Sequence, residues 1–86
     1  MEELNRLRGR INEVDSRILL LLADRAKLCE AIGSAKRSNG LPVKDAAREA
    51  EVYRRVREEA ANLGLDPVGV EAVYREIVNM CSSVQE

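Results

Sequence analysis

The 86-residue sequence contains no histidine, no tryptophan and no phenylalanine, and its only aromatic residues are Tyr53 and Tyr74. Without histidine, the chain lacks the most common metal ligand and the usual base of a nucleophilic triad. Two tyrosines are too few to form a surface on which nucleic-acid bases stack. An enzyme of this composition must work with arginine, lysine, carboxylate, amide and hydroxyl groups, which favours stabilisation of charge over covalent chemistry.

The sequence also lacks a surplus of charge and a long apolar run. Fourteen basic and 15 acidic residues give a formal net charge of −1, so nothing indicates binding to nucleic acid or to an anionic membrane. The longest apolar run, Ile18–Ala23, is far shorter than the ~20 residues of a membrane-spanning helix. No signal peptide is apparent. We expect a cytoplasmic protein with no nucleic-acid partner and no membrane association.

Cysteine is scarce, since Cys29 and Cys81 are the only two. Two thiols alone are too few for a structural zinc site, and we expect no bound metal. Free thiols in a cytoplasmic protein are expected here rather than a disulfide framework.

What the sequence does contain is one continuous helical pattern over residues 3–38. Apolar residues recur at alternating spacings of three and four, which is typical of a helix that packs along its whole length. No proline interrupts this stretch, and Ser38-Asn39-Gly40 followed by Pro42 predicts its end. The ten positions of this apolar seam are Leu4, Leu7, Ile11, Val14, Ile18, Leu21, Arg25, Leu28, Ile32 and Ala35.

The length of this helix predicts a dimer. Thirty-six residues would form a helix about 54 Å long, whereas a globule of this size has a radius of gyration of only ~12 Å. The helix would extend beyond its own domain with its seam exposed, and a second copy is the simplest cover. We therefore predict one all-α domain over residues 1–86 that forms an intertwined helical homodimer.

Two shorter helices are predicted over residues 45–62 and 67–84. Asp45 is a suitable N-cap for the first of them. Gly64 can end that helix, and Asp66-Pro67 can start the next. The fold class is thus all-α, with three helices per chain and a very long first helix. The apolar face of the third helix is expected to consist of Val70, Val73, Ile77, Cys81 and Val84.

Arg25 is the one charged residue in the apolar seam, and two interpretations are open. Its aliphatic stem could pack while its guanidinium group reaches water, or it could point inward to bind an anion, because an unpaired buried charge is costly. Arg25, Cys29, Ile32 and Lys36 share one stripe of the helix, with ~16 Å between the first and the last. Arg25 and Lys36 could therefore hold the two ends of one small dianion.

The remaining polar candidates each have an ordinary surface interpretation. Arg8 lies ~25 Å from Arg25 along the same helix, so it could share a small ligand only from a partner chain. Asp45 and Glu49, with Arg48 beside them, have the spacing of common surface ion pairs. Alternatively, the two carboxylates could accept hydrogen bonds from substrate hydroxyl groups.

Three segments of the chain, LRGRINEVDSRILLLLADR, IGSAK and PVKDAARE, together with the glutamine near the end, resemble the small all-helical chorismate mutases. The resemblance covers nearly the whole chain, and the charged positions match in order and spacing across all three helices. It implies an intertwined homodimer with two composite active sites. The implied reaction is the pericyclic rearrangement of chorismate to prephenate, which needs no metal and no cofactor.

The resemblance also implies roles for single residues. Arg8 from the partner chain and Arg25 would bind the two substrate carboxylates. Lys36 and Gln85 would be the catalytic donors to the ether oxygen of the breaking bond. The full implied substrate-binding set is Arg8, Arg25, Lys36, Asp45, Arg48, Glu49, Cys81 and Gln85.

Within this set, Asp45 and Glu49 would hold the ring hydroxyl region, supported by Arg48. Cys81 departs from the family pattern, because a serine that contacts the ring carboxylate is usual there. A thiol is a weaker donor than a hydroxyl, so Ser82 could replace that contact.

Two alternatives to a mutase remain. Isochorismate pyruvate lyases resemble the same fold and share the arginine and lysine positions, but they tend to lack the acidic pair Asp45 and Glu49. A helical dimerisation module without catalysis would explain the apolar seam equally well, but it leaves Arg25, Lys36 and Gln85 unexplained.

Overall fold

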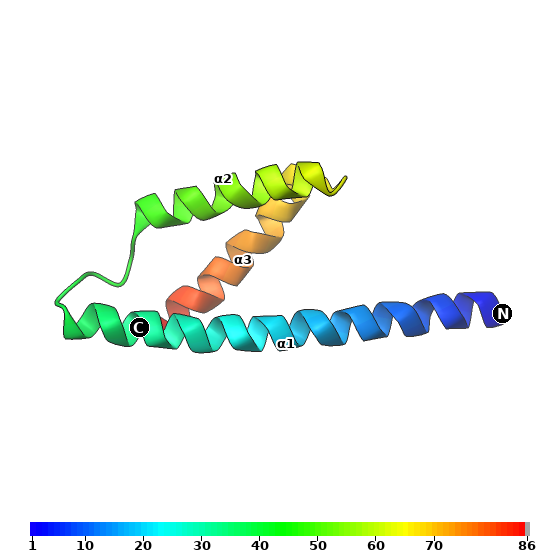
Figure 1. The fold of residues 1–86 in the computed structure, drawn as a ribbon, viewed down its shortest axis with the longest axis horizontal. Helices are drawn as coiled ribbons and strands as arrows, with labels where there is room; N and C mark the ends of the chain where they lie inside the picture. Colours follow the sequence, from blue (N-terminus) through cyan, green and yellow to red (C-terminus); the bar gives the residue numbers. More distant parts are fainter. Residues whose placement is uncertain (86) are drawn as a thin grey trace.

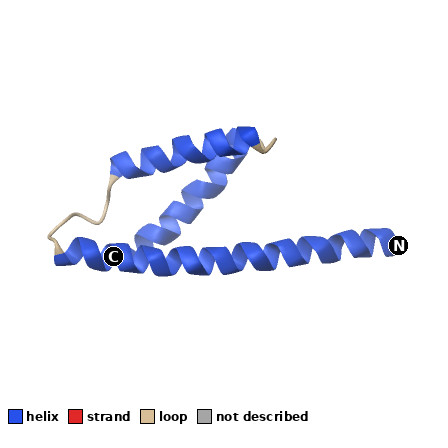
Figure 2. Ribbon diagram, in the orientation of Figure 1, coloured by secondary structure: helices blue, strands red, loops and turns tan. Residues whose placement is uncertain are grey.

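The computed structural model describes residues 1–85, which form three α-helices joined by short connections (Figure 1). Helix α1 spans Glu2–Ser38, α2 spans Ala46–Asn62 and α3 spans Pro67–Gln85. The first and last residues of each helix lie within one residue of the bounds expected from the sequence. Figure 2 shows helices and loops only over these residues. The prediction of an all-α chain with a long first helix is confirmed.

Both α1 and α2 end at a glycine with a left-handed backbone. Gly40 has a φ of 65° and Gly64 a φ of 73°, a conformation that costs glycine little because it has no Cβ atom. In both turns the N–H group of the next residue donates at 2.8 Å to the carbonyl five residues before it. This is the Schellman arrangement, which turns the chain sharply away from the helix axis.

The starts of α2 and α3 are closed by aspartate side chains, as the sequence predicts. Asp45 accepts a hydrogen bond of 3.0 Å from the backbone N–H of Arg48. Asp66 accepts one of 3.2 Å from the N–H of Val68. Each carboxylate thereby satisfies an N–H group that has no partner within its own helix.

Helix α3 is the element that joins the other two. It runs diagonally from the turn after α2 back to α1 (Figure 1) and packs against both. Over residues 1–85, α1 and α2 have no packing contact of their own. The buried apolar residues in this part of the chain are few, namely Cys29, Val56, Ala60 and Val78. Val78 is therefore the core residue of α3, whereas Val73, expected on its apolar face, is 60% exposed.

The N-terminal half of α1 extends beyond the other helices, so nothing in residues 1–85 covers its apolar seam (Figure 1). Ile11 is 60% exposed and Leu21 is 67% exposed. The longest dimension of the chain is 57 Å and its radius of gyration is 16.2 Å, well above the ~12 Å of a compact globule of this length. None of the three helices described is long and apolar enough to cross a membrane.

A disulfide between Cys29 and Cys81 joins α1 to α3, with 5.4 Å between the two Cα atoms. The expectation of free thiols is therefore wrong, because the two helices cross closely enough at these positions for the sulfurs to bond. The residues lie 52 apart in sequence, and the chain-entropy model gives a loop of this size about 4 kcal/mol of stabilisation. For a small domain with few buried residues, this is a large contribution.

Close packing of α3 on α1 depends on Gly33. A Cβ atom at this position would lie 2.8 Å from the Cα atom of Gln85 and 3.1 Å from its Cβ. The absence of a side chain at Gly33 thus lets the last turn of α3 rest directly on the backbone of α1.

At the other end of α3, one carboxylate joins it to α2. Glu71 accepts hydrogen bonds from Arg75 at 2.8 Å and from Arg57 of α2. Arg75 also lies over the ring of Tyr53, 4.4 Å from its centroid, a cation–π contact between the same two helices. The hydrogen bonds from Arg75 and Arg57 lower the pKa of Glu71 below its ordinary value of 4.5.

The Gly33→Ala substitution should destabilise the protein although alanine is the better helix former. Alanine gains about 1 kcal/mol of helix propensity, whereas overpacking against Gln85 costs about 1–3 kcal/mol. Urea denaturation measures the difference. Gly9→Ala is the matched control, because Gly9 lies in the same helix with nothing within 4 Å of its Cβ position, and it should gain stability. A stability gain at both positions would refute the close contact.

Glu71→Gln should destabilise the protein in a pH-dependent manner. Because the pKa of Glu71 is lower in the folded chain, its stabilising effect is fully present above about pH 4.5 and is lost as the pH falls through the folded pKa. The variant should therefore be less stable than the parent at pH 7 and approach it in acid. The control is Glu76→Gln, since Glu76 has no ion pair among residues 1–85. If Glu71→Gln were less stable than the parent by the same amount at every pH, the ion-pair mechanism would be contradicted.

Candidate active site

A cleft of about 420 Å³ lies between the C-terminal half of α1, the start of α2 and the end of α3. This volume is within the usual range for small-molecule sites. Seven of the eight residues expected from the sequence line it, and Ser82 lies there with them. These seven are Arg25, Lys36, Asp45, Arg48, Glu49, Cys81 and Gln85.

Lys36 and Gln85 meet within the cleft although they are 49 residues apart in sequence. The Lys36 Nζ donates to Gln85 Oε1 at 3.0 Å and to the backbone carbonyl of Val43 at 2.6 Å. An ammonium group has three N–H donors, so two are used and one remains. The Val43 carbonyl comes from the connection after α1, which the Gly40 turn directs back over Lys36.

Gln85 is a buried polar residue, only 7% exposed. Its Nε2 donates to the sulfur of Cys81 at 3.1 Å, and its backbone carbonyl accepts a hydrogen bond of 2.6 Å from Arg37. Sequence reasoning missed both Arg37 and Gly33 as supports of Gln85. An isolated glycine inside a helical pattern is a usable signal of close approach, whereas an arginine at the end of α1 looks like any surface residue.

The acidic wall of the cleft comes from the first turn of α2. Glu49 is half-buried, while Asp45 is exposed and its carboxylate also caps the helix. The guanidinium group of Arg48 pairs with Glu51 at 3.2 Å and not with either of these two carboxylates. Arg48 therefore lines the cleft without holding the acidic pair in this structure.

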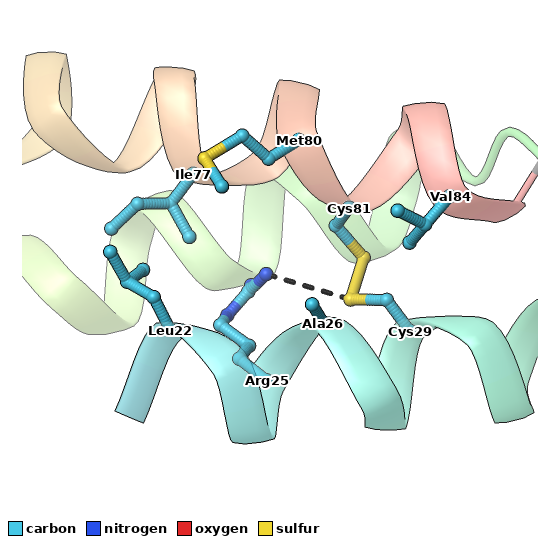
Figure 3. Close-up of a pocket in the computed structure, with 8 residues that line it drawn as sticks. All are labelled: Leu22, Arg25, Ala26, Cys29, Ile77, Met80, Cys81 and Val84. Atoms are coloured by element: carbon cyan, nitrogen blue, oxygen red, sulfur yellow. Dashed lines mark hydrogen bonds between the residues drawn. A yellow bond between two sulfur atoms is a disulfide. The ribbon is translucent and has the colours of Figure 1, made fainter. Parts of the chain in front are cut away.

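Arg25 points from α1 toward the disulfide, as Figure 3 shows. Its Nη1 lies 3.7 Å from the sulfur of Cys29, and its side chain is half-buried. The expectation that Cys81 donates a weak hydrogen bond to a ligand needs correction, because a disulfide sulfur carries no hydrogen. Ser82 lines the cleft with its hydroxyl group and is the donor that this part of α3 retains.

A second, much smaller cavity of about 40 Å³ lies beside the disulfide, and Figure 3 shows the residues that line it. Arg25, Cys29 and Cys81 line both the cleft and this cavity. The other residues around the small cavity are apolar and come from α1 and α3. The disulfide is thus part of the wall between the two spaces.

Arg8 is the expected site residue that does not line the cleft. It lies on the exposed N-terminal half of α1, about 25 Å along the helix from Arg25. No contact among the described residues of the single chain brings Arg8 to the other site residues.

The cleft has the composition of a site for a small anion. Cationic groups come from Arg25, Lys36, Lys44 and Arg48, and carboxylates from Asp45 and Glu49 at the start of α2. Apolar residues line the rest of the cleft and would contact the ring of a ligand. Two of them belong to the seam of α1, and the others were not predicted from the sequence as site residues. These apolar residues are Leu28, Ile32, Val43, Val52 and Val78.

Comparison with known proteins gives this cleft its context. The chain is 36% identical over its whole length to the bifunctional chorismate mutase/prephenate dehydratase of Aquifex aeolicus, of which it spans 25%. It is 36% identical, over 67% of the chain, to a chorismate mutase of Methanocaldococcus jannaschii, of which it covers 59%. A 4-amino-4-deoxychorismate mutase of Streptomyces pristinaespiralis is 30% identical over 90% of the chain and 60% of its own length.

The fold has a close counterpart among solved structures. A conserved hypothetical protein from Pyrococcus furiosus superimposes with a TM-score of 0.81 at 30% identity, over the whole of this chain and 99% of that one. The family model described as chorismate mutase type II matches residues 7–86. The chain belongs to the chorismate mutase type II family.

Proposed function

We propose that the protein is a chorismate mutase that rearranges chorismate to prephenate in this cleft. The observation that carries the proposal is the meeting of Lys36 and Gln85, where the Lys36 Nζ donates to Gln85 Oε1 at 3.0 Å, in a cleft that also contains Arg25. The rearrangement has one substrate and needs no nucleophile. It requires a site that orients a flexible molecule and stabilises charge, and the residues of the cleft can do both.

Orientation is the first task. The enolpyruvyl arm of chorismate must fold over the ring before the new carbon–carbon bond can form. Arg25 would hold one of the two carboxylates, and Asp45 and Glu49 would accept hydrogen bonds from the ring hydroxyl region. Holding both ends removes rotational freedom in advance, which lowers the entropic part of the barrier.

Charge stabilisation is the second task. As the C–O bond breaks, negative charge builds on the ether oxygen. The remaining N–H donor of Lys36 and the second N–H of Gln85 Nε2, which Cys81 does not use, would both donate to that oxygen. Donors fixed in advance stabilise the transition state more than the substrate, and this difference accelerates the reaction.

The exposed seam of α1 supports an intertwined homodimer. Eight aliphatic seam residues are at least 40% exposed in the single chain, and pairing two long helices would cover them. An antiparallel partner helix would bring Arg8 of the second chain to the cleft, where it would bind the second carboxylate of chorismate. Each of two active sites would then be built from both chains.

Two other substrates are tested alongside chorismate. Isochorismate would identify a pyruvate lyase, and the acidic residues on α2 count against it. The relative from Streptomyces makes 4-amino-4-deoxychorismate a specific alternative, because an amino group in place of the ring hydroxyl would also suit a carboxylate partner.

The test follows the loss of chorismate absorbance with purified protein and identifies prephenate by its acid conversion to phenylpyruvate. The other two compounds are assayed in parallel. Turnover of chorismate with the highest kcat/KM supports the proposal. Turnover of another compound alone reassigns the substrate. No turnover of any, with no heat of binding for chorismate, would identify a non-catalytic helical module.

Lys36→Ala should lower kcat/KM by about 10²–10³-fold, as loss of one donor to a developing oxyanion does. Lys27→Ala is the matched control, since Lys27 is an exposed lysine of the same helix outside the cleft. Steady-state kinetics and circular dichroism are measured for both. A loss below tenfold for Lys36→Ala would remove Lys36 from the proposed role.

Arg8→Ala and Arg25→Ala chains should each be nearly inactive alone and regain activity when refolded together. In a two-fold symmetric dimer, random mixing makes half the molecules heterodimers with one intact site of two, or about a quarter of all sites. Light scattering tests whether the mixed protein is a dimer, and kcat per site is measured. No recovery in verified heterodimers would mean that both arginines act within one chain.

A further inference from the structure

The Cys29–Cys81 disulfide lies between two residues of the proposed active site. One helical turn before Cys29 on α1, Arg25 places its Nη1 3.7 Å from the Cys29 sulfur. One helical turn after Cys81 on α3, Gln85 donates from its Nε2 to the Cys81 sulfur at 3.1 Å. Each sulfur thus contacts one functional side chain, and the bond between the sulfurs connects them.

On α3, the disulfide fixes the turn that carries Gln85. Only Ser82–Val84 separate Cys81 from Gln85, and all belong to the same helix. The other links of Gln85 to α1 are the hydrogen bonds from Lys36 and Arg37 and the contact with Gly33. These links are non-covalent, so the disulfide is the only covalent restraint on the distance between this turn and α1 within residues 1–85.

On α1, the disulfide occupies space beside Arg25. Cys29 is 4% exposed, and its sulfur lies beside the guanidinium group in the space between α1 and α3 (Figure 3). Because the Cys29 sulfur accepts a hydrogen bond from Arg25, it keeps the guanidinium group at the boundary between the cleft and the small apolar cavity. Without this sulfur in place, the guanidinium has fewer restraints on its direction.

We propose that the Cys29–Cys81 disulfide is a positioning group of the active site, which holds Gln85 and Arg25 in place, so that its reduction lowers the rate of the reaction. The inference rests on the proposed function. It gives Cys81 a role other than the one expected from the sequence, since a sulfur without hydrogen cannot bind a carboxylate.

The redox step is an ordinary thiol–disulfide exchange with a dithiol. A thiolate of the dithiol attacks the sulfur of Cys81, which is the more exposed of the pair, and the Cys29–Cys81 bond breaks. Cys29 leaves as a thiolate beside the guanidinium of Arg25, which stabilises the negative charge. The second thiol of the dithiol then releases Cys81 and closes to a cyclic disulfide. Two electrons and two protons pass to the protein.

The test compares oxidised protein with protein reduced by dithiothreitol, with thiols counted by Ellman's reagent. Kinetic constants for chorismate are measured at a temperature at which circular dichroism shows both forms folded. Reduction should lower kcat/KM about tenfold, within the 10²-fold that a displacement of 1 Å can cost. The loss of Gln85 placement should appear in kcat, and the loss of Arg25 placement in KM.

Two variants separate positioning from stability alone. Cys29→Ala/Cys81→Ala cannot form the bond, so its constants should match those of the reduced parent and not respond to dithiothreitol. In Gln85→Ala, reduction should no longer lower kcat, because the group that it displaces is absent. A lower melting temperature with unchanged kcat and KM would show a structural disulfide and overturn the proposal.

A readout without turnover separates this inference from the proposed function. The side-chain amide resonances of Gln85, assigned by their loss in Gln85→Ala, are recorded by NMR in both redox forms. They should shift or broaden on reduction. If they move while chorismate is not turned over by either form, the proposed function fails and the positioning of Gln85 stands. If they do not move, the disulfide does not position Gln85.

Discussion

The contact between α1 and the last turn of α3 is the constraint on which the rest of the structure depends. It is possible because Gly33 has no side chain, so that Gln85 lies directly on the backbone of α1. Three further interactions lie next to this contact. They are the Cys29–Cys81 disulfide and the hydrogen bonds that Arg37 and Lys36 donate to Gln85. One side of the cleft therefore exists only because two helices approach more closely than ordinary side chains would allow.

This contact also explains how the chain maintains a polar cleft with so few buried residues. A charged or amide group in a water-poor site needs hydrogen-bond partners. The backbone of the Gly40 connection supplies one through the Val43 carbonyl, and Gln85 supplies another, so Lys36 is held by two acceptors. Site residues are thus fixed largely by hydrogen bonds and one covalent bond, whereas the apolar seam of α1 is exposed in the single chain and takes little part in holding them.

Local signals in the sequence were sufficient for the fold, because caps and turns are determined by the residues within one helical turn of them. Asp45, Asp66, Gly40 and Gly64 each stand where their chemistry predicts. Contacts between distant residues were harder. Helical periodicity does not show that Cys29 and Cys81 lie opposite each other, nor that Arg37 reaches Gln85, because both depend on the angle at which α3 crosses α1. The meeting of Lys36 with Gln85 was available only through the family resemblance.

The diagonal course of α3 has a mechanical consequence. The three helices form a path that returns to its start: the Gly40 connection leads to α2, the Gly64 turn leads to α3, and α3 comes back to α1 at the crossing near Gly33 (Figure 1). Helix α3 is the one helix packed against both of the others, so it fixes the separation of the two walls of the cleft. A change in the length of α3 would therefore move α2 relative to α1 without altering a single residue that faces the cleft.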